Sequence, residues 1–297
     1  IGRVTLRHTR SPTWSLEAGG EVAFNFLESA TTLVDNGVPV MLPFSDVRVE
    51  ELRGEMFGSS TWRPNGRWSL ELGMRAEVST ITQSGDTDLE RSFFYPKPRA
   101  LVTWTPDDRN QFRLRVEREV GQLDFDDFVS SAAFNTGVVT AGNSELEPDK
   151  TWVAELAWER SFWDGGSLVV TLAHAEITDA SDRVPIYTPT DAFDAPGNIG
   201  DGTSDSVEVD LTLPLDRLGL TGARVRAALE WEVSEVIDPT TGERRRISGQ
   251  DPFDGEISFT QDVPRWNLQW GGNAYLGAFE RDFGFDTIET VEVEPWY

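Results

Sequence analysis

The sequence contains no cysteine and only two histidines, His8 and His174, among its 297 residues. The lack of cysteine excludes disulfide bonds, thiol nucleophiles and thiolate metal sites, and two histidines are too few for a multi-histidine metal centre. Basic residues are also scarce, since 26 lysines and arginines stand against 51 aspartates and glutamates, for a formal net charge of −25. Nucleic acid is therefore not an expected partner, because binding to phosphates needs a basic stripe.

Long hydrophobic runs are missing as well. No stretch approaches the length of about 18 consecutive apolar residues that a membrane helix needs, so the sequence predicts no transmembrane helix. The chain opens at Ile1, without a methionine or a recognisable signal peptide. We therefore expect a processed chain or a piece of a longer protein.

The strongest pattern that is present is a long alternation with a period of two. Between residues 67 and 79 the even positions are all apolar, from Trp68 to Val78, and the odd positions are polar, charged or glycine. Successive side chains of a strand point to opposite faces, so this stretch predicts a strand with one apolar and one polar face. The same alternation recurs along the chain, which accommodates about thirteen such strands, for example at 13–26, 152–159, 224–233 and 265–274.

The length of these strands favours a membrane barrel over a soluble sheet. Strands of soluble proteins typically have about five or six residues, whereas a tilted strand needs about ten to cross a bilayer. A β-sandwich or a solvent-facing sheet gives the same binary pattern, so strand length and regularity decide between them. The charged polar faces also suit a water-filled lumen. We therefore predict an all-β, antiparallel, up-and-down transmembrane β-barrel, with residues 1–297 as part of one barrel domain.

The connections between the predicted strands alternate between short and long. In an up-and-down barrel this places short turns on one side and long loops on the other, which is the arrangement of outer-membrane barrels. The short connections are 10–13, 63–67, 105–110, 163–167, 216–222 and 263–265, and the long ones are 34–44, 83–91, 123–149, 182–202, 237–251 and 282–286. Six tryptophans lie beside the short turns and predict an aromatic girdle at the membrane interface, namely Trp14, Trp62, Trp68, Trp104, Trp163 and Trp266.

Two segments are specific enough to suggest a family. The stretch Asn143-Ser144-Glu145-Leu146-Glu147-Pro148-Asp149-Lys150-Thr151-Trp152 leads into a strand, the turn at Gly165-Gly166 and a returning strand that ends near Ile177-Thr178-Asp179. This resembles the barrel of TonB-dependent outer-membrane receptors, in which an N-x-x-L-x-P-E stretch closes a long external loop, although Asp149 stands where glutamate is usual. Tyr95-Pro96-Lys97-Pro98-Arg99 is similar to the same family, and Val291, Val293 and Tyr297 resemble a terminal assembly signal that Pro295 interrupts.

The resemblance implies an active transporter, a 22-stranded barrel closed by a plug domain and driven by the inner-membrane TonB complex. No part of this sequence resembles the plug, and about thirteen strands cannot make 22, so we expect the plug and the remaining strands to be absent from this chain. The expected function is TonB-energised uptake of a scarce small-molecule ligand: a metal chelate such as a siderophore, a cofactor or an oligosaccharide. The expected partners are the TonB complex, the missing barrel and plug segments, lipid and lipopolysaccharide, in the outer membrane of a Gram-negative bacterium.

Two other function classes compete with energised uptake. A passive porin-like diffusion channel would need the same strands without a plug. An enzyme using paired carboxylates has no support from a nucleophile elbow, a serine–histidine arrangement or a phosphate-binding glycine loop, so we expect no enzymatic activity and no cofactor.

No residue is singled out as catalytic, cofactor-binding or metal-binding. Asp124, Asp126 and Asp127 carry oxygen ligands of the kind that calcium prefers, but they lack the spacing of a dedicated loop. Charged residues on the polar strand faces are expected either to line the ligand path or to pair across strands as part of the structure; these are Arg75, Glu77, Arg224, Arg226 and Glu230.

Overall fold

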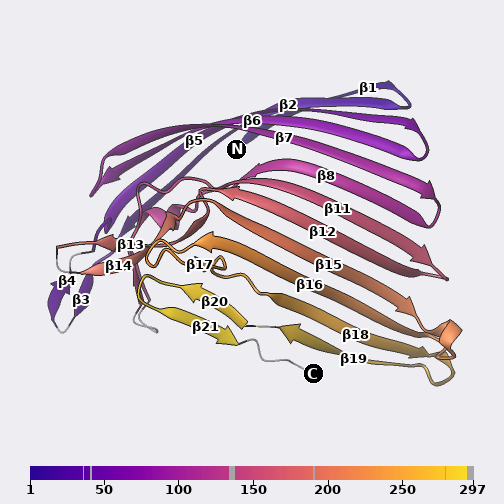
Figure 1. Ribbon diagram of the computed structural model, residues 1–297. Helices are drawn as coiled ribbons and strands as arrows, with labels where there is room; N and C mark the ends of the chain where they lie inside the picture. The colour runs from indigo at the N-terminus through magenta and orange to yellow at the C-terminus, as the bar shows by residue number, and fades with distance from the viewer. Residues whose placement is uncertain (36, 41, 134–137, 190, 278, 293–297) are drawn as a thin grey trace.

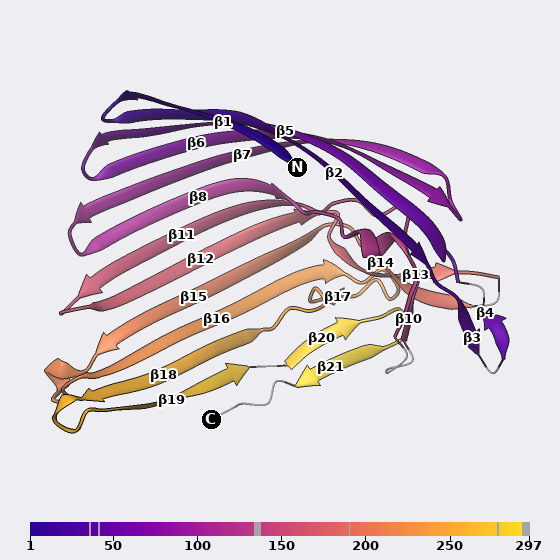
Figure 2. The same ribbon diagram turned by 180° about the vertical axis from the view of Figure 1, so that it is seen from behind.

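The fold is one large antiparallel sheet that curves from the first strand to the last (Figures 1 and 2). The computed structural model describes residues 1–35, 37–40, 42–133, 138–189, 191–277 and 279–292. None of the residues that it describes forms a helix long and apolar enough to cross a membrane. The twelve long strands are β1 (Gly2–Ser11), β2 (Trp14–Ala30), β5 (Asp46–Asn65), β6 (Trp68–Gly85), β7 (Leu89–Asp107), β8 (Asn110–Val120), β11 (Lys150–Phe162), β12 (Gly166–Thr178), β15 (Gly202–Pro214), β16 (Ala223–Ile237), β18 (Phe253–Val263) and β19 (Leu268–Gly277).

Each long strand pairs with its sequence neighbours among the long strands, so the sheet follows the chain without a crossover. The strands have between 10 and 20 residues, which confirms the predicted length, and the short β17 (Arg244–Arg245) pairs with β16 as a thirteenth strand. Within the described residues the sheet is not closed, because β1 and β19 lie at its two ends. The predicted up-and-down antiparallel barrel is thus confirmed as a partial barrel wall.

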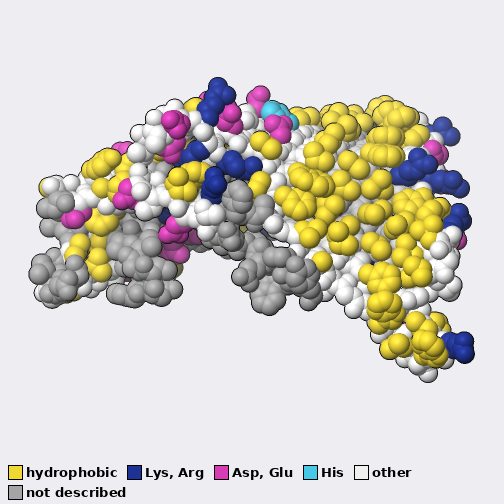
Figure 3. Space-filling view, turned by 60° about the horizontal axis from the view of Figure 1, so that its bottom comes forward, with side chains coloured by type: hydrophobic (Ala, Val, Ile, Leu, Met, Phe, Trp, Pro, Cys, Tyr) yellow, Lys and Arg dark blue, Asp and Glu magenta, His cyan; other side chains and the backbone are white. Residues whose placement is uncertain are grey.

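The two faces of the sheet differ as the alternation predicts. Figure 3 shows hydrophobic side chains gathered in one broad patch on one face of the molecule, toward the end that carries the short turns. This outer face carries large apolar side chains that are about half exposed, among them Phe24, Leu72, Leu114, Leu172 and Trp231. A soluble protein rarely exposes so large an apolar patch, whereas a lipid-facing wall requires one.

An aromatic row runs across the outer face beside the short turns. Trp68 stacks on Trp104 with ring centroids 5.6 Å apart, and Phe112 continues the row between Trp104, at 5.3 Å, and Trp158, at 6.4 Å. Trp62 is paired in register with Trp14 on the neighbouring strands. Trp163 lies in the turn between β11 and β12, and Trp266 lies in the connection between β18 and β19. All six tryptophans are therefore beside the short turns, the position at which amphipathic rings meet lipid headgroups.

The connections on the other side carry most of the additional structure. They contain the hairpin of β3 (Leu33–Asp35) and β4 (Val38–Val40), the hairpin of β20 (Phe279–Phe283) and β21 (Ile288–Glu292), and a four-stranded sheet of β9 (Ser131–Ala133), β10 (Val138–Thr140), β13 (Ser181–Tyr187) and β14 (Ala192–Asn198). Three short 3₁₀ turns complete the elements: η1 (Phe125–Phe128), η2 (Asp216–Leu218) and η3 (Pro264–Trp266).

One predicted long loop, 83–91, is in fact a tight turn of three residues between β6 and β7. The Asp86 carboxylate accepts hydrogen bonds from the backbone N–H groups of Ser45 and Asp46, at 2.8 and 3.0 Å, and from the Ser45 hydroxyl at 3.0 Å. These bonds tie the turn to the start of β5. The strands therefore continue through residues whose polarity is typical of a loop. The predicted terminal signal at Val291–Tyr297 lies for the most part outside the described residues.

The described part of the connection between β8 and β11, residues 121–133 and 138–149, folds back over the inner face of the sheet. Leu146 and Phe128 from this connection pack against Val47, Val49 and Ile81 of β5 and β6 in a buried apolar cluster. A second cluster joins Leu42 to Ala141, Phe193 and Ala195. The long connections thus form a packed external cap that rests on the barrel wall.

The segment that suggested the family accounts for the attachment of this cap. Leu146 is 2% exposed, and the Asn198 side chain exchanges hydrogen bonds of 2.8 Å with the backbone N–H and C=O of Glu147. Lys150, the first residue of β11, donates to Asp179 at 2.5 Å. The N-x-x-L-x-P stretch therefore anchors the connection between β8 and β11 at the point where the chain enters β11.

Candidate functional site

The inner face of the first six strands of the sheet carries charged side chains that pair across strands. Arg7 lies 2.6 Å from Glu17, Lys97 lies 2.8 Å from Glu77, and Arg99 lies 3.6 Å from Glu117. These side chains come from β1, β2, β6, β7 and β8 and project from one wall, because they occupy the positions opposite to the apolar ones. The predicted path residues Arg75 and Glu77 belong to this network, since Arg75 lies 3.2 Å from Glu55.

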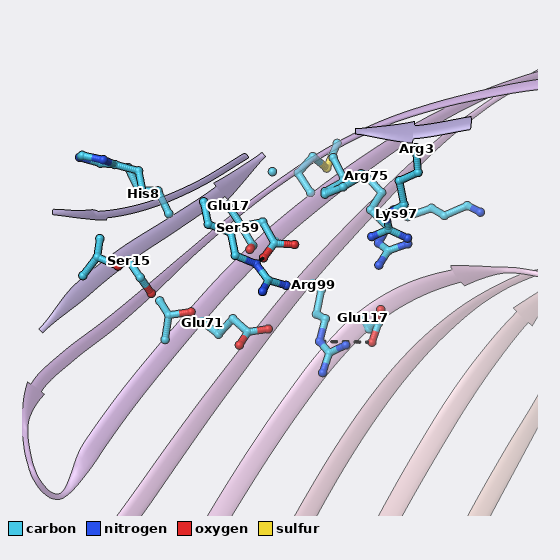
Figure 4. Close-up of a pocket in the computed structure, with 18 residues that line it drawn as sticks. Arg3, His8, Ser15, Glu17, Ser59, Glu71, Arg75, Lys97, Arg99 and Glu117 are labelled. Atoms are coloured by element: carbon cyan, nitrogen blue, oxygen red, sulfur yellow. Dashed lines mark hydrogen bonds and ion pairs between the residues drawn. The ribbon is translucent and has the colours of Figure 1, made fainter. Parts of the chain in front are cut away.

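A hollow of about 500 Å³ opens on this wall (Figure 4). Phe57 lies in it between two guanidinium groups, those of Arg3 at 4.8 Å and Arg75 at 5.8 Å from the ring centroid. Gly19 makes room for the ring, because a Cβ there would lie 2.5 Å from Phe57 Cζ and 2.3 Å from the Val4 carbonyl oxygen. The hollow is thus built from cations held against an aromatic ring, and its mixed charge suits a polar surface in contact with water or a polar partner.

The inner face of the later strands is acidic. Glu230 of β16 stands in register between Glu208 of β15 and Asp254 of β18. No lysine, arginine or histidine nitrogen in the described part of the chain lies within 4 Å of these three carboxylates. Arg224 and Arg226 lie on the same face nearer the short turns, in register with Pro214 and Thr212. The structure therefore brings Arg75 and Glu77 into one network and leaves Arg224, Arg226 and Glu230 outside it.

A second hollow, of about 660 Å³, lies among the external loops. Its wall includes Arg245 and Arg246 from the connection between β16 and β18, and Phe283 from β20. The Arg245 guanidinium donates to Asp182 of β13 and to Asp238, both at 2.7 Å, and its carbon lies 4.6 Å from the Phe283 ring centroid. Asp182 also accepts the Ser248 N–H at 3.1 Å. One buried arginine thus holds three external segments together.

The charge state of this clamp follows from its contacts. Burial raises the pKa of the Asp238 carboxyl, but the hydrogen bonds from Arg245 and from the backbone and hydroxyl of Thr241 outweigh it and hold that pKa below its ordinary value. Asp238 is therefore ionised at neutral pH. Asp182 is fully buried and Arg245 is 8% exposed, so this ion pair is shielded from solvent and from screening by salt.

The acidic cluster Asp124, Asp126 and Asp127 forms a capped turn. The Asp124 carboxylate accepts the N–H of Asp126 at 3.0 Å at the start of η1. Burial and the neighbouring Asp124 raise the pKa of Asp127. Among the residues that the structure describes, no group of three or more acidic or histidine side chains is disposed to hold a metal ion.

The arginine clamp and the hollow beside it were not predicted from the sequence. The available signal was Arg244-Arg245-Arg246, three consecutive cations within a chain that carries a net charge of −25. Their partners Asp182 and Phe283 are far away in the sequence, and period-two reasoning gives no information about contacts between loops.

Solved structures with the same architecture are receptors and transporters. The FrpB iron transporter from Neisseria meningitidis (F3-3 variant) superimposes with a TM-score of 0.65 at 11% identity, over 93% of this chain and 42% of that chain. The copper transporter OprC gives 0.68 at 13% identity, over 94% and 45%. The siderophore receptor PiuA from Acinetobacter baumannii gives 0.63 at 13% identity, over 97% and 46%. This chain therefore spans less than half the length of these proteins.

A family model provides the assignment that such low identities do not. No curated protein matches the chain in sequence. The model described as "TonB dependent receptor-like, beta-barrel" matches residues 4–293, which is nearly the whole chain. The resemblance inferred from residues 143–179 and 95–99 is thereby confirmed, and so is the predicted location. This chain belongs to the β-barrel family of TonB-dependent receptors, proteins of the outer membrane of Gram-negative bacteria.

Proposed function

We propose that this chain forms part of the wall of an outer-membrane receptor that takes up a scarce small-molecule ligand with energy from the inner-membrane TonB complex. The observation that carries the proposal is the family match over residues 4–293. The apolar outer face and the charged inner face support it, since they are the two surfaces that a transporting barrel needs. The ligand that we propose for uptake is a metal chelate, a cofactor or an oligosaccharide.

The proposal requires partners outside this chain. The main sheet ends at β1 and β19. Each unpaired backbone group at a lipid-exposed edge costs several kcal/mol, so open sheet edges do not occur within the hydrocarbon region of a membrane. We infer that further strands and a plug domain complete the barrel and that TonB acts through those parts. Lipid and lipopolysaccharide would cover the apolar outer face.

Transport involves no bond making or breaking in this reading. The family consists of receptors and transporters, and the candidate site offers ion pairs and a cation–aromatic contact rather than a nucleophile with its base. The comparisons give no support to a passive channel. Conductance measurements on the reconstituted protein distinguish the two functions, because a plugged receptor shows no open pore and a porin does.

The direct test compares cells that carry the full-length receptor with cells in which its gene is deleted. Depletion of solutes and metals from the medium is followed by mass spectrometry, with and without a protonophore. We expect at least one solute to be depleted only by cells that have both the receptor and a proton-motive force. Depletion that requires the receptor but persists with the protonophore would contradict energised uptake.

A further inference from the structure

Arginine is concentrated at the rim of the sheet that carries the short turns. Seven arginines and four aspartates lie in the short connections and their flanking residues, which are 10–13, 63–67, 105–110, 160–167, 216–222 and 263–267. The whole chain, by contrast, has 26 basic and 51 acidic residues. Dark blue side chains border the hydrophobic patch along its right edge in Figure 3. We name the seven the rim arginines: Arg10, Arg63, Arg67, Arg109, Arg160, Arg217 and Arg265.

The rim arginines are exposed, and the described chain supplies almost no counter-charge to them. All seven are exposed. Among the described residues, only Arg217 has a carboxylate oxygen within 4 Å, that of Asp164 at 4.0 Å. The carboxylates of Asp107 and Asp216 instead accept hydrogen bonds from backbone N–H groups of their own turns, at 2.8 and 2.9 Å. The rim therefore presents a row of uncompensated cations.

These cations lie at the height of the tryptophan girdle. The guanidinium carbon of Arg10 lies 4.6 Å from the Trp14 ring centroid, and that of Arg217 lies 5.9 Å from the Trp163 ring centroid. Such rings mark the level of the lipid headgroups, where an arginine can lay its aliphatic stem on apolar surface and keep its charge among polar groups.

Apolar side chains in the same turns favour lipid over a soluble partner. Leu218 and Leu220 follow Arg217 in the connection between β15 and β16, and they are 63% and 48% exposed. Exposed leucines beside an arginine suit a bilayer interface, because acyl chains and headgroups are both within reach there.

We propose that the rim arginines bind the phosphate groups of anionic phospholipids in the periplasmic leaflet of the outer membrane. Guanidinium N–H groups match the spacing of phosphate oxygens, and basic residues beside an anionic membrane surface are attracted to it. Lipopolysaccharide is not the source of the phosphate, because the short turns of such barrels face the periplasm and the long loops face outward. The inference goes beyond uptake and depends only on the membrane location and the outer face of the wall.

The test measures the lipid preference of the full-length receptor in phosphatidylcholine vesicles. Spin-labelled phosphatidylglycerol and phosphatidylcholine are the probes, and the motionally restricted fraction of each gives their relative association. Both lipids carry a phosphate, but only phosphatidylglycerol has a net negative charge. We expect the receptor to prefer phosphatidylglycerol about twofold or more, and Arg10→Gln/Arg160→Gln to remove at least about half of this preference.

The matched control is Arg224→Gln/Arg226→Gln. It removes two exposed arginines that also lie near the short turns but occupy the inner face, in register with Pro214 and Thr212. We expect the control to keep the preference of the unsubstituted receptor. A second measurement needs no variant: raising the salt concentration from about 0.1 to about 1 M should reduce the preference, because it shortens the screening length.

Three results would overturn the proposal: no preference for phosphatidylglycerol in the unsubstituted receptor, equal losses in the two double variants, or a preference that salt does not change. Binding of the rim to peptidoglycan sacculi without any lipid preference would also overturn it. Lipid binding needs neither TonB nor a proton-motive force, so its failure is distinguishable from a failure of energised uptake.

Discussion

The assignment of an outer and an inner face can be tested at two adjacent positions of β12. Leu172 lies in the middle of the 13-residue strand on the apolar face, 47% exposed, in register with Leu156 and Val207. Thr171 points to the other face, in register with Glu208. An arginine on the lipid face at the bilayer midplane costs about 2–4 kcal/mol, which corresponds to roughly 30- to 900-fold in the folding equilibrium. We expect Leu172→Arg to show this loss.

Thr171→Arg introduces the same side chain one residue away and serves as the matched control. It places a guanidinium opposite the uncompensated Glu208, where a cross-strand ion pair contributes about 0.2–1 kcal/mol in favour of folding. The assay is reversible denaturant unfolding of the full-length receptor in phospholipid vesicles, followed by the faster electrophoretic migration of the folded barrel. Equal losses for the two variants, or a larger loss for Thr171→Arg, would refute the assignment of the faces.

Three further outcomes follow from local geometry. Gly19→Ala should displace Phe57 and lower the unfolding free energy by about 1–3 kcal/mol, the usual cost of overpacking; an unchanged midpoint of unfolding would show that the ring has room. Asp182→Ala should leave Arg245 short of a partner and raise hydrogen exchange at the Ser248 amide, whereas Arg244→Gln should not. The pKa of Asp238 is lower in the folded protein than the value of about 3.9 in the unfolded chain, so its contribution to loop stability is complete above about pH 4 and is lost as the pH falls through the folded value. Hydrogen exchange in residues 238–252 should therefore rise only below about pH 4. A rise between about pH 5 and 6 would contradict the contacts of Asp238.

The sequence was sufficient for the sheet because its signals are local. Alternation over ten or more residues fixes which face of each strand is apolar, and the tryptophans beside the short turns fix the height of the membrane interface. The exception was Gln83–Arg91, where polar residues predicted a long loop. β5 to β7 extend beyond the apolar band of the wall, and Glu51 and Gln83 are buried there beneath the external cap, so composition no longer distinguishes strand from loop.

The external cap and the arginine clamp could not be predicted from the sequence, because they depend on contacts between residues that are far apart in it. Leu146 packs against Val47 and Val49, and Arg245 reaches Asp182 on another connection. Of the residues that attach the cap, only the segment 143–152 was recognisable in the sequence, through its resemblance to a family. Arg75 and Glu77 pair with Glu55 and Lys97, which lie diagonally across the neighbouring strands and not directly opposite. Glu230 lies between two acidic residues, Glu208 and Asp254. Neither arrangement follows from the sequence of a single strand.

The central claim, that this chain is one part of a larger receptor barrel, is tested most directly by the mass of the native polypeptide in outer-membrane fractions, detected with an antibody against this segment. The chain has a mass of 33.2 kDa and aligns with 42–46% of three solved receptors, so a barrel of that size class with its plug gives a prediction of about 70 to 80 kDa. A band in that range in the outer membrane would support the account. A band near 33 kDa, or one found outside the membrane fraction, would contradict it.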